Sequence, residues 1–157
     1  MKIKKLKTII GRNCLLKLLF QMKKDGNSCS VFHEKVDKQG PTLTLFETED
    51  GYKFGVYISK SFDISSRWIK DADSFLFNYI NLNKFPVKNK NSDAIFLGQK
   101  DIYGPEFYDI LTYDTIKKGK IRVGNYINKL EDLKDGNEVF INKDLLIYKV
   151  YNLFNKL

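Results

Sequence analysis

The sequence has few of the residues that build metal sites and disulfide frameworks. It contains two cysteines, Cys14 and Cys29, a single histidine, His33, and no Cys-x-x-Cys pair. A structural zinc site needs about four such ligands, and small secreted domains depend on several disulfides. We therefore expect no metal or other cofactor, two buried thiols, and an intracellular, cytoplasmic protein.

Long apolar runs and nucleotide-binding motifs are also missing. Arg12 and Lys17 interrupt the apolar stretch near the N-terminus, which argues against a signal peptide or a membrane-spanning helix. The segment 51–55, "GYKFG", has neither the G-x-G-x-x-G nor the P-loop spacing. The acidic residues on either side of residue 40 match no calcium loop. The sequence thus predicts no nucleotide or calcium site.

Most of the chain carries no excess of positive charge. The net charge is +8, from 27 basic and 19 acidic residues, but residues 1–24 hold eight of the basic residues and no acid. The rest of the chain is therefore neutral. Nucleic-acid-binding domains usually carry a basic face of their own, so nucleic acid is an unlikely partner, and any nucleic-acid or membrane contact would be made by the basic N-terminal segment.

Aromatic and β-branched residues are abundant. Twelve Phe and nine Tyr contribute to an aromatic content of 14%, and 43% of the residues are hydrophobic. Such a composition is too apolar for disorder and favours strands. A chain of 157 residues is long enough to bury the core of one domain.

A turn and a short helix are predicted at the start of the stretch 25–55. Asp25-Gly26 is a turn signal, and Ser28 or Ser30 can cap a helix that runs to Lys38. The spacing of Cys29, Phe32 and Val36 gives this helix one buried side. Gly40 can adopt the left-handed conformation that ends a helix, and Pro41 prevents the helix from continuing.

A hairpin follows. Residues 42–47 and 52–59 alternate between apolar and small or polar side chains, and Gly51 lies in the turn between them, so each strand should bury one face. Residues 15–22, "LLKLLFQM", fit either a strand with Leu16, Leu18 and Phe20 on one face or a basic amphipathic helix.

Seven further strands are predicted with turn-rich connections and no long helix between them, which favours antiparallel pairing. The fold class is therefore α+β, mostly β: an antiparallel two-sheet β-sandwich flanked by short helices. The predicted strands are 74–79, 85–87, 94–98, 109–113, 120–124, 139–141 and 145–151.

His33 is the one candidate catalytic residue. On a helix, Cys29 lies one turn behind it, so a cysteine/histidine antioxidant or hydrolytic enzyme is an open alternative. Such a site needs a third group that orients the histidine, and the sequence offers no motif for one. We favour a structural histidine and no catalytic residues.

The order of these features resembles the TLDc domain family. The resemblance rests on Asp25-Gly26, Phe32-His33, Gly40-Pro41-Thr42 and Phe54-Gly55, on "KDADSFLFNY" (70–79) with Phe75 and Phe77, and on "INKDLLIYKV" (141–150). It covers residue 8 to the end, leaving 1–7 as a basic N-terminal segment, and it makes residues 15–22 the first strand.

The resemblance implies a non-enzymatic protein-interaction domain of a divergent, protist-type member. Family members are associated with oxidative stress resistance and several bind the V-ATPase, so V-ATPase subunits are the expected partners, reached at the periphery of endomembranes. Three positions depart from the family pattern: Val56 replaces a glycine, Phe62 a tryptophan and Leu146 a glutamate.

Overall fold

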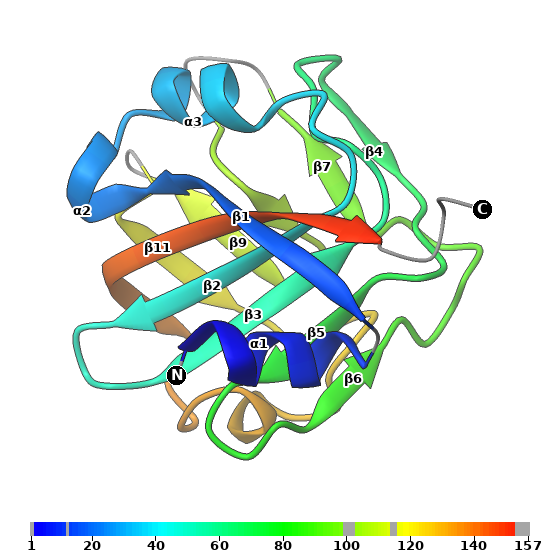
Figure 1. Cartoon of the computed structure of the whole chain (residues 1–157). Helices are drawn as coiled ribbons and strands as arrows, with labels where there is room; N and C mark the ends of the chain where they lie inside the picture. The colour runs from blue at the N-terminus through cyan, green and yellow to red at the C-terminus, as the bar shows by residue number, and fades with distance from the viewer. Residues whose placement is uncertain (1, 12, 99–102, 114–115, 153–157) are drawn as a thin grey trace.

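The computed structural model describes residues 2–11, 13–98, 103–113 and 116–152 (Figure 1). The described helices are α1 Lys2–Ile10, α2 Met22–Asp25, α3 Cys29–Val36 and the 3-10 helix η1 Leu130–Asp132. The described strands are β1 Cys14–Gln21, β2 Thr42–Thr48, β3 Lys53–Ile58, β4 Arg67–Ile69, β5 Phe75–Asn78, β6 Lys84–Pro86, β7 Ile95–Leu97, β8 Glu106–Phe107, β9 Ile110–Tyr113, β10 Lys118–Ile121 and β11 Val139–Asn152.

The strands form two antiparallel sheets. The main sheet has the order β6-β5-β3-β2-β11-β10-β9, and β1 also pairs with β11; the small sheet has the order β4-β7-β8. Strand β11 is the longest, at 14 residues. Its first residues pair with β10, and the remainder pairs with β1 and β2. The predicted mostly-β, antiparallel two-sheet class is confirmed.

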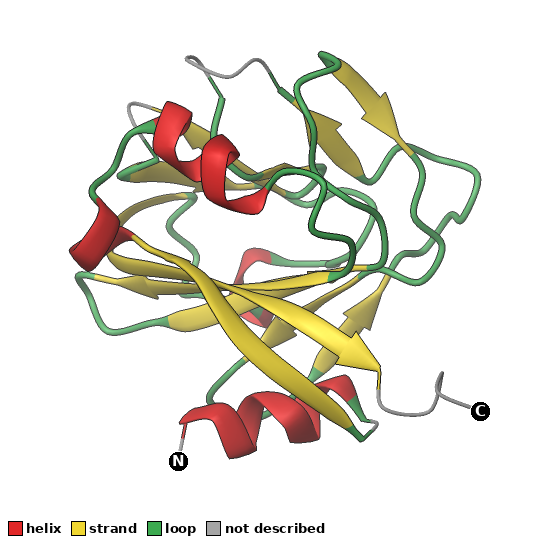
Figure 2. Ribbon diagram, turned by 45° about the horizontal axis from the view of Figure 1, so that its top comes forward, coloured by secondary structure: helices red, strands yellow, loops and turns green. Residues whose placement is uncertain are grey.

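Both faces of the main sheet are covered, as Figure 2 shows. One face carries the larger core, which includes Phe46 and Phe54 and is closed by α3 and by the small sheet. The other face carries a second core, which includes Leu43 and Leu45 and is closed by α1. The prediction that each hairpin strand buries one face was therefore wrong, because it did not include a helix over the second face.

Helix α1 holds most of the basic N-terminal segment against the sheet. Its residues Leu6, Ile9 and Ile10 are buried in the second core, and its Lys2 forms an ion pair with Glu47 on β2. The helix continues through residue 8, where we expected the domain to start, so residues 2–7 pack on the sheet and do not extend from it. The outer ends of the predicted division, residue 1 and residues 153–157, lie outside the described residues.

The ambiguous stretch 15–22 is a strand through Gln21, as the family resemblance implies, but its faces differ from the prediction. Leu18 is 41% exposed while Phe20 is fully buried. The register against β11 shifts between these two residues, and a β-bulge of this kind turns the following side chains to another face. The predicted common face of Leu16, Leu18 and Phe20 is therefore wrong.

Helix α3 begins as predicted and ends earlier. Ser28 is its N-cap, and the Ser28 Oγ accepts from the N–H of Val31 at 3.4 Å. The helix ends at Val36 and not at Lys38, because Lys38 takes a left-handed conformation with φ 60° and donates its N–H to the Phe62 carbonyl at 2.9 Å. Cys29, Phe32 and Val36 are buried as expected.

Two more strand predictions need correction. The segments 139–141 and 145–151 belong to one strand, β11, whose register against β2 shifts between Asn142 and Asp144. The short strands β4 and β8 were not predicted; β8 has two residues, too few for a readable alternation.

Candidate functional site

The residues that carry the family resemblance lie in turns and in the core. Asp25 ends α2, where its carboxylate accepts from the Gln21 N–H at 2.9 Å and pairs with Lys35 at 2.9 Å. Gly26 follows with φ 85°, a conformation that glycine adopts without strain. These contacts fix the turn between β1 and α3.

The Gly-Pro-Thr step joins α3 to the sheet. Gly40 has φ 77°, and its N–H donates to Ser61 Oγ at 2.8 Å. The Pro41 carbonyl accepts from the Val150 N–H at 3.0 Å, and Thr42 is buried at the start of β2. The stretch 40–42 is therefore bonded both to the loop at Ser61 and to strand β11.

The hairpin glycines have different roles. Gly51, with φ 93°, closes the β2–β3 turn by donating its N–H to the Thr48 carbonyl at 3.0 Å. Gly55 lies inside β3, where a Cβ would collide with the Thr44 carbonyl oxygen and the Phe77 ring. Gly55 thus permits strands β2 and β5 to approach β3 closely on its two sides.

The phenylalanines of the family pattern are packing residues. Phe32 contacts the rings of Phe20 and Phe62 at centroid distances of 6.2 and 5.4 Å. Phe54 stacks on Phe46 at 5.3 Å and meets Phe140 edge-on at 5.2 Å. Two others lie on the second-core side, Phe77 fully buried and Phe75 stacked on Tyr57 at 5.2 Å.

His33 is held by two acceptors. Its Nδ1 lies 2.8 and 2.9 Å from the two carboxylate oxygens of Asp37, and its Nε2 lies 2.8 Å from the Tyr103 carbonyl. The ring is 3% exposed. Both ring nitrogens are thus within hydrogen-bond distance of groups of the domain itself. His33 therefore ties α3 to the segment that begins at Tyr103.

Cys29 and His33 lie one turn apart on α3, and both are buried. Cys29 is 6% exposed, and both ring nitrogens of His33 are directed at Asp37 and Tyr103. The sequence did contain an orienting acid, since Asp37 lies four residues after His33 on the same helix side, and our expectation that none was present is corrected.

The three departures from the family pattern are buried. Val56 and Phe62 are each 1% exposed in the larger core, and Leu146 is 4% exposed in the second core. Exchanges at these positions therefore change packing and leave the exposed surface as it is.

A groove lies where β11 begins, next to the β2–β3 turn. It has a volume of about 310 Å³ and is lined by the acidic turn residues Glu49 and Asp50, by Asn137, and by Val139, Phe140 and Ile141. Val139 and Ile141 are 46% and 39% exposed. Pairing of β11 with β2 begins at Asn142, so the groove occupies the sheet edge before that pairing starts. We name it the β11 groove.

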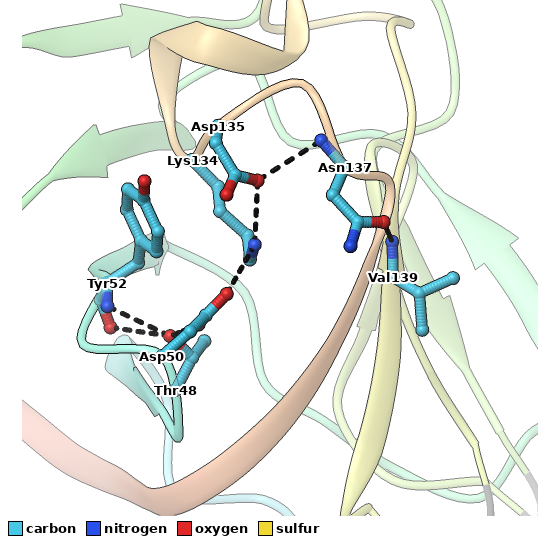
Figure 3. Close-up of polar contacts among 7 residues, drawn as sticks. All are labelled: Thr48, Asp50, Tyr52, Lys134, Asp135, Asn137 and Val139. Carbon is cyan, nitrogen blue, oxygen red and sulfur yellow. Dashed lines mark hydrogen bonds and ion pairs between the residues drawn. The ribbon is translucent and has the colours of Figure 1, made fainter.

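Lys134 lies next to the β11 groove and pairs with Asp50, one of its lining residues (Figure 3). Its Nζ lies 2.6 Å from Asp50 Oδ2 and 2.8 Å from Asp135 Oδ1, and the ammonium sits 4.8 Å from the centre of the Tyr52 ring. Although the side chain is fully buried, the ammonium is surrounded by two carboxylates and an aromatic face, which compensate for the lost water.

The polar chain in Figure 3 continues on both sides of Lys134. Thr48 Oγ1 donates to Asp50 Oδ1 at 2.6 Å. The Asn137 N–H donates to Asp135 Oδ1 at 3.1 Å, and the Val139 N–H donates to Asn137 Oδ1 at 3.2 Å. The hairpin turn and the start of β11 are therefore fixed relative to each other.

These contacts shift three pKa values. Burial alone raises the pKa of Asp50, but hydrogen bonds from Lys134 and Thr48 hold it below its ordinary value. The hydrogen bond from Lys134 likewise lowers the pKa of Asp135. Burial alone lowers the pKa of Lys134, but its bonds to Asp135 and Asp50 raise it. All three groups are therefore charged at neutral pH.

Sequence reasoning did not find the β11 groove. "TEDG" at 48–51 was read as a turn, and Lys134-Asp135-Gly136 as connecting chain. Asp50 lies more than 80 residues before Lys134 in the sequence, so their ion pair leaves no local signal. It depends on which strands meet in the sheet.

Within the described part of the chain, no three His, Cys, Asp or Glu side chains gather closely enough to hold a metal ion. None of the described helices has the length and apolar character to cross a membrane.

Two antiparallel sheets, a buried histidine and a surface groove describe a β-rich domain. The family model for the TLDc domain matches residues 2–151, and the chain belongs to the TLDc domain family. It is 36% identical over 62 residues to the MTOR-associated protein MEAK7 of Mus musculus, an alignment that covers 40% of this chain and 14% of that protein.

Proposed function

We propose that this chain is a non-enzymatic protein-interaction domain, that it binds V-ATPase subunits at the periphery of endomembranes from the cytoplasm, and that it contributes to oxidative stress resistance. What supports the interaction role is the β11 groove, in which exposed apolar side chains of β11 lie beside acidic turn residues. A partner can bury Val139 and Ile141 there and pair with Glu49.

The location of the basic N-terminal residues favours a protein partner over a membrane or a nucleic acid. The apolar side of α1 is packed on the sheet, so it is not available to a bilayer without leaving the second core. Lys5 donates to the Ile80 carbonyl at 3.2 Å and lies 4.5 Å from the Tyr79 ring centre. Lys5 therefore has partners within the domain, as Lys2 has in Glu47.

The test is a native affinity pull-down from the source cell, with quantitative mass spectrometry, of the wild type and two matched variants. Val139→Glu places a charge in the β11 groove. Ile80→Glu makes the same exchange at a residue that is 59% exposed outside the groove. We expect the wild type and Ile80→Glu to capture V-ATPase subunits and Val139→Glu to lose them.

Capture by all three proteins would remove the β11 groove from the proposal, and capture of no pump subunit by the wild type would remove the V-ATPase. The name of the mouse relative suggests a second partner class, and the same experiment scores mTOR. Peroxide consumption that is lost in both Cys29→Ala and His33→Ala would instead support an enzyme.

A further inference from the structure

The outer face of the small sheet carries a row of aromatic residues. In the register of β4, β7 and β8, Trp68 is opposite Phe96, and Phe96 is opposite Glu106. Their neighbours in the strands, Ile95 and Phe107, are fully buried and belong to the larger core. Since successive side chains of a strand alternate between faces, Trp68, Phe96 and Glu106 point away from that core.

The rings of this face contact one another in sequence. Trp68 lies 5.1 Å from Phe96 and 5.9 Å from Tyr108, and Phe96 lies 5.1 Å from Tyr103, measured between ring centres. Tyr108 is 37% exposed. None of these four residues belongs to either core. We call Trp68, Phe96, Tyr103, Tyr108 and Glu106 the aromatic face.

Glu106 is the acidic residue of the aromatic face. Its Oε2 is buried and has no hydrogen-bond partner among the described residues. Burial raises the pKa of its carboxyl, and the positive charge of Arg122 opposes that effect. A carboxylate that is shielded from water and lacks a donor costs free energy, and a cationic donor removes that cost.

The chain itself shows that this surface accommodates a guanidinium. Arg122 lies 4.8 Å from the centre of the Tyr108 ring and donates from Nε to the Tyr108 carbonyl at 2.6 Å. Among the described Lys and Arg side chains, none lies over the rings of Trp68 or Phe96. Tryptophan offers the strongest aromatic surface for a cation.

We propose that the aromatic face docks a partner segment that presents an arginine, whose guanidinium stacks on Trp68 or Phe96 and pairs with Glu106. Arginine fits better than lysine because its planar fork can stack on a ring and donate to a carboxylate at the same time. Trp, Tyr and Arg are also the residues that most often dominate binding energy at interfaces.

This inference rests on the proposed interaction role and adds a second surface to it. The aromatic face belongs to β4, β7 and β8, whereas the β11 groove lies between the β2–β3 turn and β11. Aromatic sheet faces also bind single-stranded nucleic acids, but those surfaces pair their rings with positive charge, and Glu106 would repel phosphates. A cationic peptide segment is the occupant that the charge favours.

Trp68 is the single tryptophan of the chain, so its fluorescence reports on this face directly. The experiment titrates the purified domain with an acetylated, amidated Gly-Arg-Gly-Arg-Gly peptide, with Gly-Lys-Gly-Lys-Gly and Gly-Glu-Gly-Glu-Gly as matched probes. We expect saturable binding of the arginine peptide that weakens by about ten-fold or more in Glu106→Gln. Glu49→Gln, which changes an acid of the β11 groove, should bind like the wild type.

Several results would overturn the inference: no saturable response to the arginine peptide, equal responses to the arginine and glutamate peptides, or unchanged binding in Glu106→Gln. A uridine oligonucleotide that binds more tightly than the peptide would also overturn it, in favour of nucleic acid. Glu106→Gln in the native pull-down separates the two proposals. If the variant captures V-ATPase subunits as the wild type does, the proposed function stands and this inference fails.

Discussion

The aromatic residues of this domain fall into two groups that differ in what covers them. Phe46, Phe54 and Phe140 contact one another in the larger core and are at most 2% exposed. The Trp68 ring contacts the rings of Phe96 and Tyr108 at similar centroid distances, 5.1 and 5.9 Å, yet all three residues lie outside both cores. The first group is enclosed by the fold, and the second is the surface that we propose for a partner.

The largest expected effect is on the buried group. Phe54→Ala should destabilise the domain by about 3–5 kcal/mol, because it removes a ring that packs on two others and leaves a cavity. Phe96→Ala, the same exchange on the aromatic face, is the matched control and should cost much less. The free energy of unfolding in urea, followed by circular dichroism, gives both values. Equal losses in the two variants would contradict the division of the aromatic residues into a buried and an outer group.

The next effect tests the close approach of strands β2 and β5 to β3 at Gly55. Gly55→Ala should cost about 1–3 kcal/mol, because the added Cβ meets the Thr44 carbonyl and the Phe77 ring. Gly136→Ala is the control, since a Cβ there comes nearest to the flexible end of the Glu131 side chain. Thermal unfolding should separate the two variants. Equal melting temperatures would show that β2 and β5 can move away from β3.

A smaller effect is expected at the rim of the β11 groove. Lys134→Met should cost about 1–2 kcal/mol at neutral pH, near the low end because Asp50 and Asp135 are half exposed. Lys120→Met removes an exposed pair with Glu138 and should cost less. Urea unfolding at pH 7 measures both changes.

The Lys134 contribution should also depend on pH. Because the folded protein lowers the pKa of Asp50 from 3.8, the stabilisation is present above pH 3.8 and is lost as the pH falls through the lower, folded value. The gap between the wild type and Lys134→Met should therefore shrink in acid. A gap that stays constant from neutral pH to acid would mean that Asp50 does not stabilise the lysine.

The sequence predicted the elements whose signals are local. Ser28 caps α3 and Gly51 closes the hairpin, since turn chemistry acts over a few residues. The bulge between Leu18 and Phe20 and the cover of the second face by α1 were missed, because each depends on a partner far along the chain. The aromatic face was unpredictable for the same reason, since Trp68 and Phe96 become neighbours only through pairing of β4 with β7.

The most direct test of the division is the unfolding of Trp68→Ala beside Phe54→Ala in urea, followed by circular dichroism because the first variant has no tryptophan. We predict that Trp68→Ala lowers the free energy of unfolding by less than about 1 kcal/mol, as is usual for surface positions, while Phe54→Ala lowers it by at least about 3 kcal/mol. Losses of the same size in the two variants would mean that the aromatic face is a third core, and the account would be wrong.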